Sequence, residues 1–212
     1  ITGSSVGLLI SFPLFLIIGL YIKLVSSGPV FFKQIRIGYN GVPFNFWKFR
    51  TMKVNNNVSS HSNYYKELIT SNKPMKKLDD KKDPRIIFGG KIIRKSCIDE
   101  LPQLWNILKG EMSLVGPRPC IPYEAEAYLR WHTHRFDIIP GLTGLWQVSG
   151  KDKLSFREMI SLDIIYSQNL SLFLDLEIIL ITIPAIIMMI LEAVVKKINI
   201  KKTDDERLES LS

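Results

Sequence analysis

An apolar run near the N-terminus constrains the fold of this chain more than any other feature. Val6 to Ile22 is almost wholly apolar over about 17 residues, and a straight helix of that length spans about 25 Å, against roughly 30 Å of bilayer hydrocarbon. Pro13 removes a backbone N–H and presses on the preceding turn, so we expect a kink there. The residues fit a helix that enters one leaflet and returns, a tilted full span, or a buried core helix.

Charge and composition narrow the class of protein. The net charge is +8, which implies an anionic partner such as nucleic acid, lipid head groups or a phosphorylated substrate. Hydrophobic residues make up 46% of the chain and charged residues 23%, so most of it forms a packed core and is not disordered. The length of 212 residues suits one domain plus a membrane element, or two small domains. Cys97 and Cys120 are too few for a disulfide framework.

A β-hairpin is predicted after the apolar run. Residues 30–37 and 42–50 have the composition of strands, and Asn40–Gly41 between them is a strong turn signal. The two-residue period of a strand places four side chains of the second strand on one face: Phe44, Phe46, Lys48 and Arg50. The two cations either close a site or are solvated beyond the sheet edge, and the residues alone slightly favour solvation.

An adjacent carboxylate pair, Asp99–Glu100, precedes Pro102. Proline is tolerated in the first turn of a helix, so we predict an N-cap near Asp99 and a helix that stops at Gly110. The apolar residues of this helix recur at helical spacing: Leu101, Leu104, Trp105 and Leu108. The positive end of a helix dipole keeps a carboxylate ionised and attracts phosphate, although an Asp at this position is often only a cap.

Basic residues and a Gly-Pro-Arg-Pro corner flank this pair in the sequence. Gly116–Pro117–Arg118–Pro119 turns the chain and presents a guanidinium, and a carboxylate pair facing a fixed arginine suits chemistry on a phosphate. Asp83–Pro84–Arg85 begins an ordered segment that leads to Arg94, which is close enough in sequence to hold either the carboxylate or a phosphate. Residues 140–151, which end at Lys151, predict a glycine-punctuated turn and strand that a ligand can approach closely.

The remaining segments predict helices and a polar loop. Residues 64–69 are expected to form a short helix inside a lysine-rich loop, and residues 156–168 a helix with Asp163 inward. Residues 178–191 form a second apolar run, broken by Pro184 and flanked by acidic residues. Its length and flanks favour an interfacial helix over a span. The lysines that follow suit anionic lipids: Lys196, Lys197, Lys201 and Lys202.

Taken together, these segments resemble the bacterial sugar transferase family, the monotopic polyprenyl-phosphate phosphoglycosyl transferases. The resemblance extends from about Pro13 to Asp175. The motifs that carry it, in order, are Ile22–Leu24, Ser27–Gln34, Lys48–Met52, Asp83–Arg85, Arg94, Asp99–Leu104, Gly116–Pro119, Pro140–Gly144 and Leu162–Asp163.

The resemblance implies a reaction and its reactants. A membrane-bound enzyme moves a sugar 1-phosphate from a nucleotide diphospho-sugar, expected to be a UDP-sugar, to polyprenyl phosphate such as undecaprenyl phosphate, and releases UMP. This is the first membrane step in assembling a surface glycan such as an exopolysaccharide, capsule, O-antigen or glycoprotein. A covalent phosphosugar-aspartate intermediate lets two polyanions that repel each other visit the site in turn.

The resemblance also assigns roles to residues of this chain. Asp99 is implied as the nucleophile, and Glu100 as metal or acid–base support, with Asp99 and Glu100 holding the Mg²⁺ that the family requires. Arg118 would clamp phosphate bidentately, and Lys48 and Arg94 match other phosphate-site cations of the family. Two positions depart from it. Phe12, not serine, precedes the kink proline. Lys151, a further candidate for binding phosphate or substrate, stands where many members have arginine and offers a point charge in place of a fork.

The predicted fold is α+β, mostly helical with a small β-hairpin or sheet, an N-terminal re-entrant membrane helix kinked at Pro13 and interfacial amphipathic helices. We divide it into a re-entrant helix (1–25), a catalytic domain (26–175), an interfacial helix (176–200) and a tail (201–212). The resemblance implies a monotopic protein of the bacterial inner membrane, with its catalytic domain on the cytoplasmic face. Anionic lipids are expected partners, and an oligomer is compatible with the sequence.

Two other classes of function compete with the transferase. A non-catalytic membrane scaffold of a glycan-assembly complex needs none of the candidate site residues, so their presence argues against it. A nucleic-acid binder would suit the basic charge, and the aromatic strand 44–49 superficially fits a stacking platform. Such a protein has no need of the apolar run at residues 6–22, so nucleic acid is not an expected partner. The sequence does not reveal which sugar or nucleotide is used.

Overall fold

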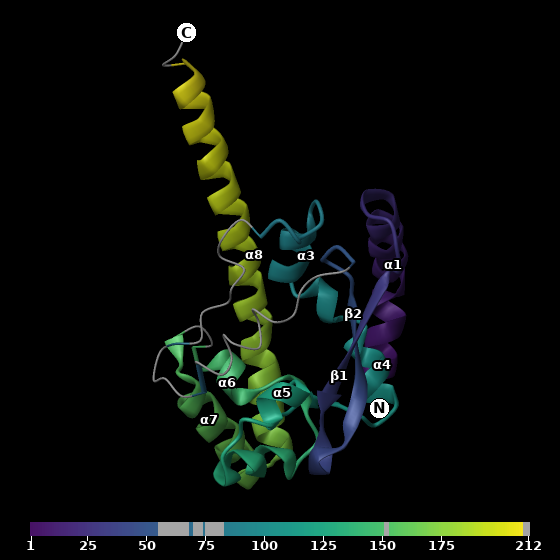
Figure 1. Cartoon of the computed structure of the whole chain (residues 1–212), viewed down its shortest axis with the longest axis vertical. Coiled ribbons are helices and arrows are strands. Elements are labelled where there is room, and N and C mark those ends of the chain that lie inside the picture. Colours follow the sequence, from purple (N-terminus) through teal and green to yellow (C-terminus); the bar gives the residue numbers. More distant parts are fainter. Residues whose placement is uncertain (55–67, 70–73, 75–82, 151–152, 210–212) are drawn as a thin grey trace.

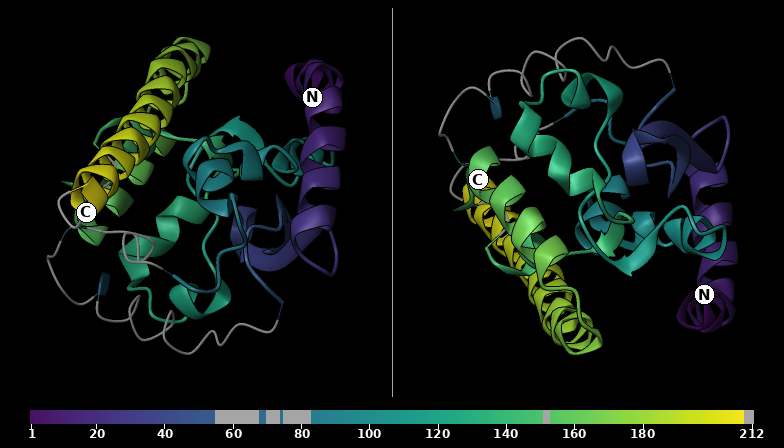
Figure 2. Two further views of the ribbon diagram at one scale, coloured as in Figure 1. Left: turned by 90° about the horizontal axis from the view of Figure 1, so that it is seen from above. Right: turned by 90° about the horizontal axis from the view of Figure 1, so that it is seen from below.

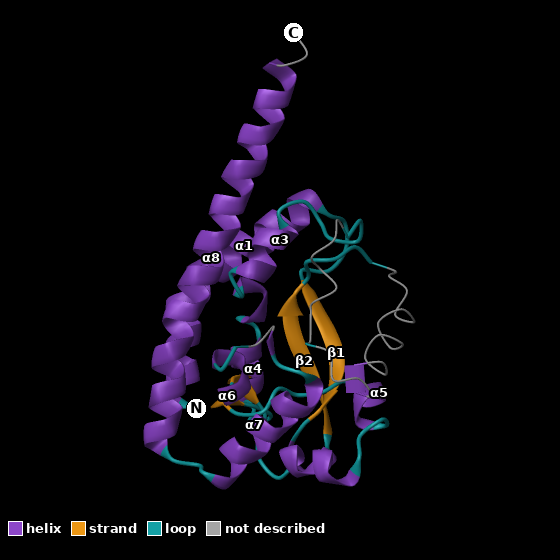
Figure 3. Ribbon diagram, turned by 90° about the vertical axis from the view of Figure 1, so that its left-hand side faces the viewer, coloured by secondary structure: helices purple, strands orange, loops and turns teal. Residues whose placement is uncertain are grey.

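The protein is described here by a computed structural model, which covers residues 1–54, 68–69, 74, 83–150 and 153–209. Two long helices, α1 (Thr2–Val25) and α8 (Leu172–Glu209), lie on opposite sides of the molecule (Figures 1 and 2). The strands and the short helices fill the space between them. Figure 3 shows that helix predominates and that the strands are few and short, so the predicted mixture of helices with a small sheet is confirmed.

One face of helix α1 packs against the domain, and the opposite face lies at the surface of the molecule. In its first half, Gly7 approaches Leu104, and in its second half Ile22, which is fully buried, packs with Phe49 and Ile87. The exposed face carries large apolar side chains: Leu9, Ile10, Phe12, Leu16, Ile17, Leu20 and Leu24. In the described part of the chain, α1 is the helix that is long and apolar enough to cross a membrane. Because most of its side chains are at the surface, the alternative of a buried core helix is wrong.

Pro13 lies inside α1, and the helix is continuous through it. Its ring nitrogen cannot donate to the carbonyl of Leu9, four residues earlier. The hydroxyl of Ser11 donates instead to the carbonyl of Gly7, with an Oγ–O distance of 2.6 Å. This hydroxyl therefore does not bond the carbonyl that proline leaves unpaired, and the re-entrant bend stays a prediction.

The predicted hairpin is confirmed. Strand β1 (Phe31–Ile37) pairs antiparallel with β2 (Pro43–Phe49), and Phe31 lies opposite Phe49. Asn40 and Gly41 in the turn both have left-handed backbone, with φ of 53° and 75°, which Asn and Gly adopt at the lowest cost. The hairpin packs on α1 through aromatic rings in edge contact, with 5.0 Å between the centroids of Phe15 and Phe49.

The slight preference that the strand period gave for solvation of Lys48, in β2, and of Arg50, which follows β2, is wrong. Arg50 is 4% exposed and donates to the carbonyls of Ser26 and Ser27, with N–O distances of 2.8 and 2.7 Å. It thereby satisfies carbonyl groups at the C-terminal end of α1 that have no helical partner. Lys48 pairs with carboxylates, as described below. Neither partner could be read from the strand period, because both belong to other elements.

A second small sheet joins β3 (Ser113–Val115) and β4 (Gly141–Thr143) in parallel. For residues 140–151 we predicted a turn and strand, and the strand has only three residues before helix α6 (Leu145–Val148) begins. Glycine is required at position 141, where these two backbone segments touch, since a Cβ on Gly141 would lie 2.1 Å from the amide nitrogen of Gly116.

The later helices follow the sequence closely. Helix α7 (Phe156–Gln168) is confirmed, with Ser155 as its N-cap and Glu158 closing a capping box. Helix α8 includes Pro184 and runs across the boundaries predicted at residues 175 and 200. The remaining short elements are α3 (Gly90–Lys95), α4 (Gln103–Leu108), α5 (Pro122–Ala125) and a 3-10 helix over Arg130–Phe136. Most of the helix predicted at 64–69 lies outside the described residues.

Candidate active site

The carboxylate pair lies in a tight turn between two short helices. Cys97 has left-handed backbone with φ of 56°, and Ile98–Glu100 then forms one 3-10 turn. Helix α4 begins only after Pro102, which is its N-cap. The prediction that Asp99 caps an α-helix is therefore wrong, because the reversal at Cys97 tightens the chain into i→i+3 hydrogen bonds first. Asp99 therefore does not lie at the positive end of an α-helix dipole.

Lys48 of β2 contacts both carboxylates. Its Nζ lies 2.6 Å from Oε1 of Glu100 and 3.5 Å from Oδ2 of Asp99. The exposed fractions of these side chains are 21% for Lys48, 28% for Glu100 and 7% for Asp99. The two carboxylates thus converge on one cation at the surface, with Asp99 the more deeply placed.

The pKa of Asp99 is raised above its ordinary value. Burial is the main cause, and the negative charge of Glu100 acts in the same direction, while the charges of Lys48 and Arg94 lower it. A buried carboxylate attracts any cation that comes close, because burial removes the water that would otherwise stabilise its negative charge. Asp99 is therefore placed to exchange its lysine contact for a metal ion or an electrophilic phosphorus.

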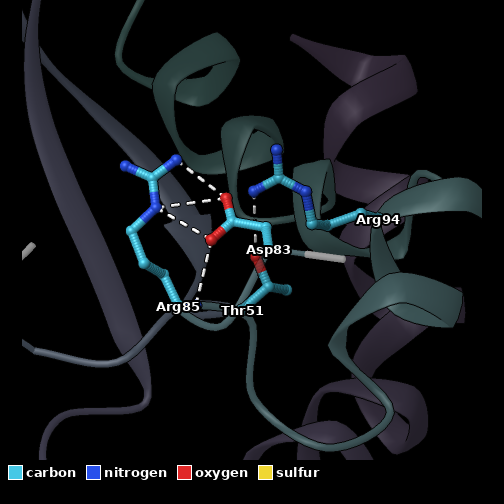
Figure 4. Close-up of polar contacts among 4 residues, drawn as sticks. All are labelled: Thr51, Asp83, Arg85 and Arg94. Carbon is cyan, nitrogen blue, oxygen red and sulfur yellow. Dashed lines mark hydrogen bonds and ion pairs between the residues drawn. The ribbon is translucent and has the colours of Figure 1, made fainter. Parts of the chain in front are cut away.

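Arg94 of α3 lies on a second side of the site. Its guanidinium donates to the hydroxyl of Thr51 at 3.4 Å, and its charge lowers the pKa values of both Asp99 and Asp83. Figure 4 shows Asp83 between the guanidinium groups of Arg94 and Arg85. The Arg85 side chain donates to both oxygens of Asp83, at 2.7 to 3.1 Å. These hydrogen bonds are the main reason that the pKa of Asp83 falls to about 2.

The corner that carries Arg118 is held at every peptide. The carbonyls of four consecutive residues, Pro117 to Cys120, each accept a hydrogen bond. The donors, in order, are the amide of Gly141, the side chain of Arg135, the side chain of Arg36 and the amide of Ile37, at 2.8, 2.8, 3.1 and 2.8 Å. The backbone of Arg118 is therefore fixed, and its side chain is half-buried.

A buried ion pair, Arg135–Asp163, supports this corner through the hydrogen bond from Arg135 to the carbonyl of Arg118. Arg135 and Asp163 lie 2.6 Å apart between Nη2 and Oδ2, and their side chains are 2% and 1% exposed. The inward placement predicted for Asp163 is confirmed. Burial raises the pKa of Asp163 to about 6, and the charges of Arg135 and Arg118 act against that rise. The hydroxyl of Tyr128 accepts from Arg135 Nη1 at 2.7 Å.

The structure brings the predicted site residues together to different extents. Lys48, Asp99 and Glu100 are in direct contact, and Arg94 acts on Asp99 through its charge. Arg118 is among the charged residues that act on Asp163, and Lys151 lies outside the described residues.

Sequence reasoning missed three buried polar residues that hold the site: Arg36, Arg135 and Asn106. The strand period offers only a weak signal for Arg36, which lies opposite Phe44 and has its guanidinium 5.1 Å from the ring centroid of Phe46. No sequence pattern marks Arg135 or Asn106, because the partners that place them, Asp163 for Arg135 and Asn45 and Trp47 for Asn106, lie far away in the sequence.

The donor set fits a cation that arrives with its substrate. Within the described residues, no three His, Cys, Asp or Glu side chains gather at one point, so a closed all-protein metal cage is not formed there. Asp99 and Glu100 do converge on a single ammonium group. Mg²⁺ is commonly bound by one or two carboxylates, with waters and substrate phosphates as its other ligands. The pair matches that pattern.

The model of the family described as "Bacterial sugar transferase" matches residues 1–189. The chain belongs to the bacterial sugar transferase family. Both the resemblance and the prediction of a transferase are confirmed. The match includes α1, the hairpin, the carboxylate turn, the Arg118 corner and the described part of the chain through most of the apolar stretch of α8.

Curated relatives cover most of this chain. It is 42% identical over 188 residues to an exopolysaccharide production protein, ExoY, of Rhizobium meliloti, which covers 88% of this chain and 82% of the relative. It is 42% identical to the galactosyl transferase CpsE of Streptococcus agalactiae, over 89% of this chain and 41% of the relative. It is 37% identical to a UDP-glucose:undecaprenyl-phosphate glucose-1-phosphate transferase of Klebsiella pneumoniae, over 85% of this chain and 37% of the relative.

Proposed function

We propose that this chain transfers a sugar 1-phosphate from a UDP-sugar to polyprenyl phosphate, with release of UMP. The observation that carries the proposal is the cluster of Asp99, Glu100 and Lys48, in which a nearly buried carboxylate lies beside a partly exposed cation. Relatives that share the family and carry the names of sugar-phosphate and galactosyl transferases support it. The first relative is named for exopolysaccharide production, which supports a role in surface glycan assembly.

The chemistry follows from the position of Asp99. Its carboxylate oxygen attacks the phosphorus that carries the sugar, and the bond from that phosphorus to the oxygen shared with UMP breaks, so that UMP leaves with the electron pair. An oxygen of the lipid phosphate then attacks the same phosphorus and the bond to Asp99 breaks. The carboxylate is regenerated, and the lipid carries a diphosphate linked to the sugar.

Cationic side chains prepare the site for two polyanions in turn. Lys48 contacts both carboxylates and would turn to the incoming phosphate oxygens, which relieves the pull that it exerts on Asp99. Arg94 and Arg118 add positive charge from two further elements, and their guanidinium groups suit bidentate contact with phosphate. Asp99 and Glu100 would hold Mg²⁺, which when bound neutralises charge on the diphosphate.

We further propose that the chain is monotopic, with α1 re-entrant and the catalytic domain on the cytoplasmic face of the bacterial inner membrane. Both halves of α1 pack on the domain, so a full span would draw charged elements of the domain towards hydrocarbon. The outer face of α8 also carries exposed apolar side chains, among them Leu172, Phe173, Leu176 and Leu180. Lysines at 196, 197, 201 and 202 follow in the sequence and suit anionic lipid head groups.

The function is tested with detergent-solubilised protein, polyprenyl phosphate, Mg²⁺ and a panel of UDP-sugars that includes UDP-glucose, UDP-galactose and UDP-N-acetylhexosamines. We expect UMP release that depends on the lipid phosphate with one or a few of these sugars. Intact-mass analysis without lipid should show a phosphosugar adduct that disappears when lipid is added. Absence of UMP release with every sugar, from protein shown to be folded, would contradict the proposal.

The topology is tested with single cysteines at the two ends of α1. Thr2→Cys and Ser27→Cys are both at exposed positions, and each is placed in a background with Cys97→Ser and Cys120→Ala. A membrane-impermeant thiol reagent applied to intact cells should label neither variant until the cells are lysed. Labelling of Thr2→Cys alone from outside would show that α1 spans the bilayer. The natural upstream sequence must be kept, since added spans change how the N-terminal end is presented.

A further inference from the structure

Asn106 is a fully buried amide whose partners lie on a different element. It sits in α4 with no exposed surface. Its Nδ2 donates to the carbonyl of Asn45 at 2.7 Å, and its Oδ1 accepts from the amide of Trp47 at 3.2 Å. The second Nδ2 hydrogen is taken by the Glu111 carboxylate, 2.6 Å away. Every donor of this amide group is therefore used.

These contacts give β2 a partner on its outer edge. The hairpin has only two strands among the described residues, so β2 is bonded to β1 on one side and has no strand on the other. Asn106 supplies there one donor and one acceptor, as a neighbouring strand would. The two backbone groups that it holds, at Asn45 and Trp47, lie three residues and one residue before Lys48.

We propose that Asn106 is a positioning residue that sets Lys48 against Asp99 and Glu100. The amide joins the strand that carries the lysine to the helix that directly follows the carboxylate turn. The lysine side chain is partly exposed, so its own ion pairs contribute little to fixing the strand. The fixed geometry comes from the buried amide, and the inference rests on the function proposed above.

Placement at this level matters for rate. A displacement of about 1 Å at a reacting group can cost on the order of 100-fold in turnover. Loss of Asn106 would free β2 at Asn45 and Trp47, and Lys48 would no longer hold one distance to the two carboxylates. Substrate binding through Arg94 and Arg118, on other elements, would change less. We therefore expect kcat to fall and KM for the UDP-sugar to stay nearly constant.

A double-mutant cycle separates positioning from general stability. Asn106→Ala is expected to lower kcat by about 10- to 100-fold in the wild-type background. In a Lys48→Met background it should lower kcat by less than about 3-fold, because the residue through which it acts is gone. Asn106→Ser, whose single hydroxyl cannot bond Asn45, Trp47 and Glu111 together and which adds no charge, provides a second variant if alanine prevents folding, with a loss of kcat in the same range expected.

Ile107→Ala is the matched control. Ile107 is the next residue of α4, is 4% exposed and packs beside Phe46, so its truncation weakens the same helix–hairpin contact without touching the amide. It should lower thermal stability as much as Asn106→Ala or more, and leave kcat within about 3-fold of wild type. Equal losses of kcat in the two variants would show that Asn106 is merely structural and would overturn the inference.

Hydrogen exchange supplies a readout that needs no activity. Asn106→Ala should increase exchange at the Trp47 amide relative to other hairpin amides, whereas Ile107→Ala should not. If wild type releases UMP but the effects of Asn106→Ala and Lys48→Met multiply, the inference fails and the proposed function stands. If wild type is inactive with every sugar, the proposed function fails, and unchanged exchange at Trp47 would still overturn the role of Asn106 in holding β2.

Discussion

Two cation–carboxylate clusters of this protein use the same chemistry in opposite surroundings. Lys48 with Asp99 and Glu100 is open to solvent at the lysine and the glutamate, at 21% and 28% exposure. Arg135 with Asp163 is closed, with both side chains at 2% exposure or less. The open cluster joins a strand to a tight turn, and the closed pair joins a 3-10 helix to α7.

The difference separates reactivity from support. A closed pair cannot exchange its partner without leaving a buried charge uncompensated, and that loss is far larger than the worth of an exposed pair. An open cluster can exchange its partner for phosphate or metal at little cost. Burial, and not residue type, is therefore the reason that we propose a chemical role for the first cluster and a supporting role at the Arg118 corner for the second.

The largest expected effect belongs to the open cluster. Asp99→Asn should reduce turnover by several powers of ten, since an amide cannot act as the nucleophile. Protein yield and thermal stability should stay near wild type, because the amide has the same shape. UMP release and intact mass with the UDP-sugar measure the outcome. Turnover above about 1% of wild type would remove Asp99 from its assigned role.

The closed pair should respond in stability. Arg135→Met leaves Asp163 buried without its cation, and we expect a loss of about 3–5 kcal/mol in the free energy of unfolding. The double variant Arg135→Met/Asp163→Leu should recover most of that loss, since no charge is left alone. Denaturant unfolding in detergent measures both. A single variant as stable as wild type would show that the pair does not hold this region.

Lys48→Gln tests whether the open cluster contributes to turnover without contributing much to the free energy of unfolding. The free energy of unfolding should change by less than about 1 kcal/mol, as for other exposed pairs. We expect kcat to fall by about 10- to 100-fold, because a preorganised cation at the phosphate is lost. A stability loss as large as that of Arg135→Met, with kcat unchanged, would reverse the assignment of the two clusters.

The smallest effect is expected at a third pair, Asp83–Arg85. The pKa of Asp83 is lowered from 3.8 to about 2, chiefly by hydrogen bonds from Arg85. A carboxyl with a depressed pKa in the folded state stabilises the fold above its unfolded pKa, and that contribution is lost as pH falls from about 4 to about 2. Asp83→Asn should therefore be less stable than wild type at pH 6 and nearly equal to it at pH 2. Melting curves across this range give the comparison, and a difference independent of pH would contradict it.

Local signals in the sequence were sufficient for several parts of the molecule. The left-handed turn at Asn40–Gly41 and the capping box at Ser155 each involve residues within a few positions of one another. The turn residues predicted the hairpin and apolar residues at helical spacing predicted α7, and both predictions were correct. The adjacency of Asp99 and Glu100 and the apolar run of α1 likewise need only the order of residues. The family could be recognised on such motifs.

Tertiary structure decided which charged groups meet. Glu100 is 52 residues from its lysine partner, and Asp163 is 28 residues from Arg135. Periodicity places a side chain on a face but does not say which element packs against that face. The strand period therefore slightly favoured solvent for Lys48 and Arg50, whereas Lys48 is found on the carboxylates, as the family resemblance implied for a site residue, and Arg50 is found capping α1.

The sequence by itself determined the chemistry available to this protein: a carboxylate pair, basic residues for phosphate and an apolar helix. Only the tertiary structure decided that Asp99 is nearly buried beside Lys48 and that Asn106 ties that region to the strand of Lys48. The physical reason is that turns and helix caps are set by neighbours in the chain. Burial and ion-pair partners are set by contacts between segments far apart, whose geometry exists only once the domain has folded.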